Sequence, residues 1–215
     1  AHRTAYCSSS PTAAATDHKN SNKAMVYKEL GTKEAASREK FGATVTKELT
    51  SIIQKNSALG FPVARQSLPE GAKIFKAKLL YGIKGIELPE DEQKDKARLV
   101  AGGHMYVDNN GRVTMTRTPA SKGEYWAPCA SLAACRYVAA YAAATGSSLE
   151  TVDLETAYLQ ADYQEEGAYI ELPECTFAYM PSEWIERITE AKQSGDGRVC
   201  FPVLRALYGL QRSGY

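Results

Sequence analysis

A short apolar run that encloses a single acid, directly after an alanine-rich helical pattern, constrains the fold of this chain most strongly. Residues 131–145 predict a helix, and residues 149–154 predict a short strand in which Val152 and Leu154 flank Asp153. An aspartate at the end of a core strand lies where α/β folds usually place their chemistry. A surface or turn aspartate is the other interpretation, and position alone does not decide between the two.

The N-terminal half predicts a tail, a helix and a hairpin. Residues 1–30 are polar, turn-forming and non-periodic, so we expect them to be disordered. A helix is predicted from about Lys33 to Lys55, because apolar residues recur there at helical spacing. These residues are Phe41, Val45, Leu49, Ile52 and Ile53. Residues 73–83 and 97–101 then predict two strands of a hairpin, joined by a charged loop that includes residues 90–96.

Composition and charge narrow the class of protein. The 215 residues, 44% hydrophobic and 24% charged, are those of an ordinary globular protein with a substantial core. No apolar run approaches membrane-spanning length, and no signal-peptide pattern opens the chain. The five cysteines form no Cys-x-x-Cys pair, which favours reduced thiols in an intracellular protein, and three scattered histidines argue against a zinc site.

The net charge of +1 is unevenly distributed. Residues 153–215 contain 5 basic and 11 acidic residues, a net charge of −6, which leaves +7 for residues 1–152. A basic half beside an acidic half fits nucleic-acid contact next to a cation-binding region. Two solvent-exposed surfaces of opposite charge without any binding function would give the same net charges.

Four sequence blocks follow one another in a specific order. They are Lys96-Ala-Arg-Leu-Val100, Val152-Asp-Leu-Glu-Thr-Ala-Tyr-Leu159, Tyr169-Ile-Glu-Leu-Pro-Glu174 and Leu207-Tyr-Gly-Leu210. This succession resembles the reverse transcriptase of copia-type retrotransposons, which has a Lys-Ala-Arg-Leu-Val, an Asp-Val-x-x-Ala-Phe-Leu, a Tyr-Met-x-x-Pro-Glu and a Leu-Tyr-Gly-Leu block in the same order. Each block is weak alone, but four in order are specific, and the resemblance covers roughly residues 38–215.

The resemblance implies an α+β fold, the fingers and partial palm of a right-hand polymerase, with an antiparallel sheet and packed helices. On this interpretation residues 1–30 are the disordered tail, residues 31–128 a fingers-like region with a hairpin, and residues 129–215 a partial palm. The segment 105–125, which contains the turn signal Asn109-Asn110-Gly111, is longer than the usual connection of the family, and we interpret it as an insertion.

The implied activity is that of an RNA-directed DNA polymerase, which extends a primer on an RNA or DNA template with deoxynucleoside triphosphates. Two Mg²⁺ ions stabilise the attacking and leaving oxygens in such a reaction. By matching position, Asp153 is the catalytic residue and a metal ligand, and the backbone carbonyl of Leu154 joins it. The family's second carboxylate pair lies in a Tyr-x-Asp-Asp hairpin, and this chain ends at Tyr215 before that block. We therefore expect the chain by itself to be inactive.

The resemblance assigns the nucleotide pocket to five further positions besides Leu154. Tyr158 corresponds to an aromatic gate at the sugar, although an aromatic packed under the strand is equally compatible with the residues alone. Lys96 and Arg98 share one face of a strand and could clamp the triphosphate, or could simply be solvated on an edge strand. Tyr208 and Gly209 would form the pocket floor, whereas a lone Tyr-Gly-Leu would be a helix start without a ligand.

The remaining positions add weaker expectations. Four hairpin lysines could bind template or be solvated: Lys73, Lys76, Lys78 and Lys84. Relatives usually carry an arginine at the position of Gly102 and often a basic residue at the position of Glu155. The chain departs from the family at both positions. The resemblance also implies a larger polyprotein with protease, integrase and ribonuclease H regions, in a cytoplasmic virus-like particle or in the nucleus, without a membrane partner.

Two other functions compete with polymerisation. The chain could be a catalytically dead or domesticated fragment that at most binds nucleic acid through its basic half. It could also be an unrelated α/β domain that uses Asp153 for other Mg²⁺-phosphate chemistry, a possibility that four ordered blocks argue against.

Overall fold

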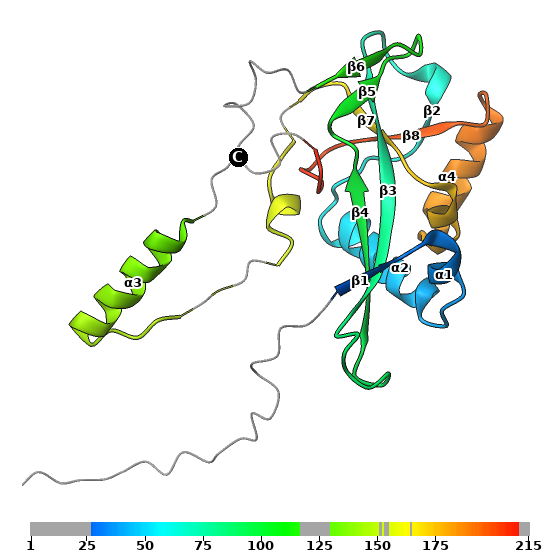
Figure 1. Cartoon of the computed structure of the whole chain (residues 1–215). Coiled ribbons are helices and arrows are strands. Elements are labelled where there is room, and N and C mark those ends of the chain that lie inside the picture. Colours follow the sequence, from blue (N-terminus) through cyan, green and yellow to red (C-terminus); the bar gives the residue numbers. More distant parts are fainter. Residues whose placement is uncertain (1–26, 117–129, 151, 153–154, 164, 211–215) are drawn as a thin grey trace, which may run out of the picture.

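The computed structural model describes residues 27–116, 130–150, 152, 155–163 and 165–210, a mixed α+β structure with a large, mostly antiparallel sheet (Figure 1). The strands are β1 (Tyr27–Leu30), β2 (Val63–Ala64), β3 (Lys73–Lys84), β4 (Lys94–Ala101), β5 (Met105–Val107), β6 (Val113–Met115), β7 (Ala168–Glu171) and β8 (Val199–Pro202). The helices are α1 (Thr32–Ala36), α2 (Phe41–Thr50), α3 (Leu132–Thr145) and α4 (Ser182–Gln193).

The long strand β3 organises the sheet. Its C-terminal part pairs antiparallel with β4 and β1, whereas its first four residues pair parallel with β7, which in turn pairs with β8. One main hydrophobic core includes residues from α2, β3, β4, β7 and β8. Strands from the fingers-like and the palm-like sequence ranges are therefore joined directly through β3.

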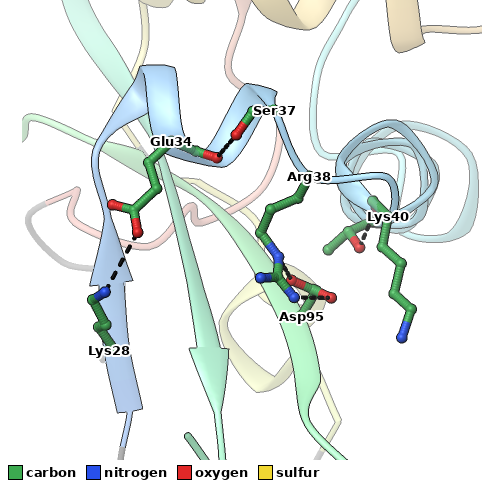
Figure 2. A network of polar contacts seen from close by, with 7 residues as sticks. Lys28, Glu34, Ser37, Arg38, Lys40 and Asp95 are labelled. Carbon is green, nitrogen blue, oxygen red and sulfur yellow. Dashed lines mark hydrogen bonds and ion pairs between the residues drawn. The ribbon is translucent and has the colours of Figure 1, made fainter. Parts of the chain in front are cut away.

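Helix α2 covers one face of the β3–β4 hairpin. All five apolar residues of the predicted stripe are buried, and the ring of Phe41 contacts that of Tyr81 on β3 with centroids 5.2 Å apart. The helical segment is broken, however: α1 ends at Ala36, α2 begins at Phe41, and a π-helical turn follows at Ser51–Lys55. The break brings Arg38 against β4, where it pairs with Asp95 (Figure 2).

Two boundaries differ from those expected from the sequence. Residues 27–30 form β1 rather than the end of a tail, because they pair with residues 81–84 of β3 and bury Leu30. The second strand of the hairpin begins at Lys94, so the charged loop is shorter than predicted. Charged residues can lie in this strand because alternate positions face solvent.

Within residues 131–154, the described structure agrees with the sequence prediction for the helix but not for the strand that was expected to follow it. Helix α3 is confirmed: Ser131 Oγ accepts a hydrogen bond from the Ala134 N–H at 3.1 Å, and Gly146 ends the helix with φ 67°. The strand is wrong at the positions that the structure describes, because Leu149 and Val152 are exposed and not in a strand. Asp153 and Leu154 lie outside the described residues.

The predicted turn is confirmed. Asn109-Asn110-Gly111 connects β5 to β6, with Gly111 at φ 80°. Helix α4 buries Trp184 and Ile188 on one side. None of the described helices is long and apolar enough to cross a membrane.

Candidate nucleic-acid interface

One face of the β3–β4 hairpin carries a concentration of cationic side chains. Side chains alternate between the two faces of a strand, and Tyr81, Ile83 and Leu99 are buried on the face that α2 covers. The opposite face therefore presents the cations of both strands except Lys73, which points to the other side and pairs with Glu165, and neither strand contributes an acid to it. We call this surface the basic face, and it consists of Lys76, Lys78, Lys84, Lys94, Lys96 and Arg98.

The cations of the basic face lie close enough to disfavour one another's charge. Lys84 lies directly opposite Lys94 in the register of the two strands, and like charges opposite each other destabilise a sheet. The pKa of Lys96 is lowered by burial first and then by the positive charges of Arg98 and Lys84. Perturbed charges of this kind are one mark of functional sites, so the basic face is a candidate site for an anion.

At one end of the basic face, three of the predicted pocket residues meet. The guanidinium carbon of Arg98 lies 5.7 Å from the ring centroid of Tyr208, within cation–π range. The ring of Tyr158 contacts that of Tyr208 edge to face, with centroids 5.4 Å apart and 78° between the planes. Arg98 and Lys96 are two residues apart on β4, so Lys96 lies on the same face as this cluster.

The turn that presents Tyr208 is fastened to β4 through the backbone. The Ala101 N–H donates to the Tyr208 carbonyl at 2.7 Å, and the Gly103 N–H donates to the Gly209 carbonyl at 3.1 Å. Gly209 has φ 91°, and a Cβ there would overlap the Ala101 carbonyl oxygen. The glycine therefore permits a close approach of the turn to β4.

The predicted metal ligands cannot be placed beside this cluster. Asp153 and the Leu154 carbonyl, the expected Mg²⁺ ligands, lie outside the described residues. Within the part of the chain that the structure describes, no three or more histidine, cysteine, aspartate or glutamate side chains form a group that could hold a metal ion. The described residues thus include the predicted nucleotide-pocket residues other than Leu154, but not the predicted metal ligands.

Glu48 is a residue beside the site that the sequence interpretation missed. Its carboxylate accepts a hydrogen bond from the Leu99 N–H at 3.1 Å and so covers part of the outer edge of β4. Burial raises the pKa of Glu48, although this hydrogen bond and the charges of Arg98 and Lys96 oppose the rise. The signal was present in the sequence, because position 48 follows Val45 by three residues on the apolar stripe of α2.

We expect Glu48→Gln to be more stable than the wild type at pH 7. The amide oxygen can still accept the Leu99 N–H, and no charge is then buried. Because the pKa of Glu48 is higher in the folded chain than in the unfolded one, the folded state binds the proton more tightly. The disadvantage of the wild type is therefore complete above the raised pKa and fades as pH falls towards an ordinary glutamate pKa of about 4.3.

Urea unfolding at pH 7 and at pH 4 checks this expectation. Glu48→Ala is the matched control, since it leaves the Leu99 N–H without this acceptor. It should lose about 1–2 kcal/mol at pH 4 and less at pH 7, where the wild type itself is penalised by the buried charge. A Glu48→Gln variant that tracks the wild type at both pH values would show that burial does not penalise this carboxylate.

Comparisons with known proteins add no relatives: no protein-family model, curated protein or solved structure matches the chain. Its function must therefore be inferred from the four sequence blocks and from the geometry of the described residues.

Proposed function

We propose that this chain is the fingers and partial palm of a copia-type reverse transcriptase, an RNA-directed DNA polymerase that binds a primer–template and a deoxynucleoside triphosphate. The observation that carries this proposal is the cluster of Arg98, Tyr158 and Tyr208. These residues come from three of the four blocks and are far apart in sequence, yet their side chains are in contact. The contact between residues of three separate blocks supports the family resemblance.

In this function the cationic residues bind the triphosphate. Lys96 and Arg98 neutralise the charge that develops on the leaving pyrophosphate, and a guanidinium suits bidentate phosphate contact. Tyr208 and Gly209 would form the floor of the pocket, and Tyr158, in contact with Tyr208, would gate the sugar. Asp153 and the Leu154 carbonyl would hold Mg²⁺, which supplies electrostatic stabilisation of the attacking and leaving oxygens when it is bound.

The extent of the basic face favours a second candidate, nucleic-acid binding without polymerisation. Lys84 and Lys94 lie at the tip of the hairpin, whereas the cluster around Tyr208 lies at the other end of β4. Cations along the whole hairpin exceed what a single triphosphate needs, but they suit a polyanionic backbone. This function requires neither Asp153 nor a second carboxylate pair.

The proposal predicts that Arg98→Gln weakens deoxynucleoside triphosphate binding by about tenfold or more, since a hydrogen bond to a charged group contributes roughly 1.5–3 kcal/mol. Fluorescence anisotropy with a labelled nucleotide and Mg²⁺ measures the affinity of the chain. Lys40→Gln is the matched control, because it removes one positive charge, as Arg98→Gln does. Lys40 is exposed at the start of α2 and does not lie on the basic face. Equal affinities of the two variants would remove Arg98 from the pocket.

Primer extension separates the two candidate functions. In a chain extended through a Tyr-x-Asp-Asp hairpin, Asp153→Asn should abolish Mg²⁺-dependent extension while leaving primer–template binding intact. Unchanged extension would overturn the assignment of Asp153 as a metal ligand. Binding that weakens with salt, with no extension by the wild type, would leave nucleic-acid binding as the function.

A further inference from the structure

The ring of Tyr27 lies on the basic face, in the space left by a glycine. Tyr27 is opposite Lys84 in the pairing of β1 with β3, so it shares the face of Lys84. A Cβ at Gly82 would overlap the phenol ring of Tyr27, which shows that the ring covers this glycine. The neighbouring Lys28 points to the other side, where it pairs with Glu34 at 3.4 Å (Figure 2).

This aromatic side chain is exposed and lies beside two cations and one acid of the same face. Tyr27 is 46% exposed although its ring rests on the sheet. Lys84 is its partner on β3, and Gly82 lies between Lys96 on β4 and Glu29 on β1, so the two lysines leave a net positive charge around the ring. A large aromatic surface that remains open to solvent among positive charges is the combination that binds unpaired nucleotides.

We propose that Tyr27 is a stacking platform for an unpaired base, and that the basic face around it binds single-stranded nucleic acid. An unpaired base would lie on the Tyr27 ring, while Lys84 and Lys96 would contact the phosphates on either side. A duplex keeps its bases stacked inside and presents mainly phosphates to a sheet, so it would gain little from the ring. The inference rests on the proposed function only in requiring nucleic acid on the basic face.

A purely structural role for Tyr27 makes a different prediction. An aromatic ring that covers a glycine in a sheet stabilises the strand pairing, and its loss would then lower stability without selecting between nucleic acids. Tyr27→Leu keeps an apolar cover over Gly82 but removes the aromatic surface. Tyr27→Trp keeps both, and so distinguishes stacking from cover.

The test compares binding of the chain to a labelled deoxythymidine 20-mer and to a duplex of the same length, by fluorescence anisotropy at one salt concentration. Tyr27→Leu should weaken single-strand binding about tenfold and change duplex binding less than twofold, as expected from the loss of one base–aromatic stack. Tyr27→Trp should bind single strands as the wild type does. Tyr137→Leu is the matched control, because Tyr137 is an exposed tyrosine on α3.

A stacked base also has a direct spectroscopic signature. An oligonucleotide with 2-aminopurine at successive positions should be quenched by the wild type at one of them, and Tyr27→Leu should remove that quenching. Equal single-strand affinity of Tyr27→Leu and the wild type would overturn the stacking role. Binding of duplex alone would also overturn it but leave the proposed function standing, whereas failure to bind either nucleic acid would overturn both.

Discussion

Replacing Arg38 with alanine should destabilise the fold by about 3 kcal/mol, the cost typical of leaving one partner of a buried ion pair uncompensated. Its guanidinium makes two hydrogen bonds to Asp95, Nε to Oδ1 at 2.6 Å and an Nη to Oδ2 at 3.3 Å (Figure 2). The side chain of Asp95 is only 2% exposed. The hydrogen bond to Asp95 is also the main reason that the pKa of Arg38 is raised.

The same network contains the matched control for this variant. Lys28 and Glu34 pair at 3.4 Å with side chains 51% and 57% exposed, so Lys28→Ala should cost less than about 0.5 kcal/mol. Urea unfolding of both variants gives the comparison. A loss for Arg38→Ala no larger than that for Lys28→Ala would mean that Asp95 finds another partner or water.

A double replacement tests the origin of the effect. Arg38→Met together with Asp95→Leu removes both charges, and it should lose less stability than Arg38→Ala alone, since no charge is then left buried. A double variant that loses the sum of the two single effects would argue against a coupled pair. The pair joins the turn between α1 and α2 to β4, so it also fixes the strand that carries Lys96 and Arg98.

Local patterns in the sequence predicted much of the fold. The apolar spacing of α2, the Asn109-Asn110-Gly111 turn and the alanine-rich pattern of α3 each depend on neighbours within a few residues. The alternation of Lys96 and Arg98 on one face is local in the same sense. These features follow from helical and strand periodicity alone, and the structure confirms them.

Contacts between distant segments could not be predicted in this way. Arg38 and Asp95 are 57 residues apart, and nothing in their surroundings marks them as partners. The pairing of β1 with β3 likewise depends on a partner strand that periodicity does not specify. The strand predicted at residues 149–154 is not formed at Leu149 or Val152, and whether an apolar residue joins a sheet likewise depends on partners that local periodicity does not specify.

In the candidate site, too, local features could be predicted from the sequence and contacts between distant segments could not. Strand alternation predicted the face shared by Lys96 and Arg98, whereas the meeting of Arg98, Tyr158 and Tyr208 could be expected only from the family resemblance. Tyr27 was assigned to the tail, because only the pairing of β1 with β3 places it on the basic face. The predicted metal ligand Asp153 lies outside the described residues, so its role stays a prediction.

Replacing Gly209 with alanine should cost about 3 kcal/mol and should also weaken nucleotide binding. Mutations that force backbone groups together belong to the strongly destabilising class, and a Cβ here would overlap the Ala101 carbonyl oxygen and lie 2.8 Å from Val100 Cγ1. The turn must then move away from β4 and break the hydrogen bond between the Ala101 N–H and the Tyr208 carbonyl. Tyr208 would thereby lose its cation–π contact with the guanidinium of Arg98.

Gly111→Ala isolates the contribution of the clash. Gly111 also has a positive φ, 80° against 91° for Gly209, but nothing lies within 4 Å of the position its Cβ would occupy. This variant should therefore lose only the backbone cost of about 1 kcal/mol and bind nucleotide normally. Thermal unfolding and labelled-nucleotide anisotropy on both variants measure the two effects together. If Gly209→Ala loses stability but binds nucleotide as Gly111→Ala does, the turn matters for folding alone, and Tyr208 is not part of the pocket.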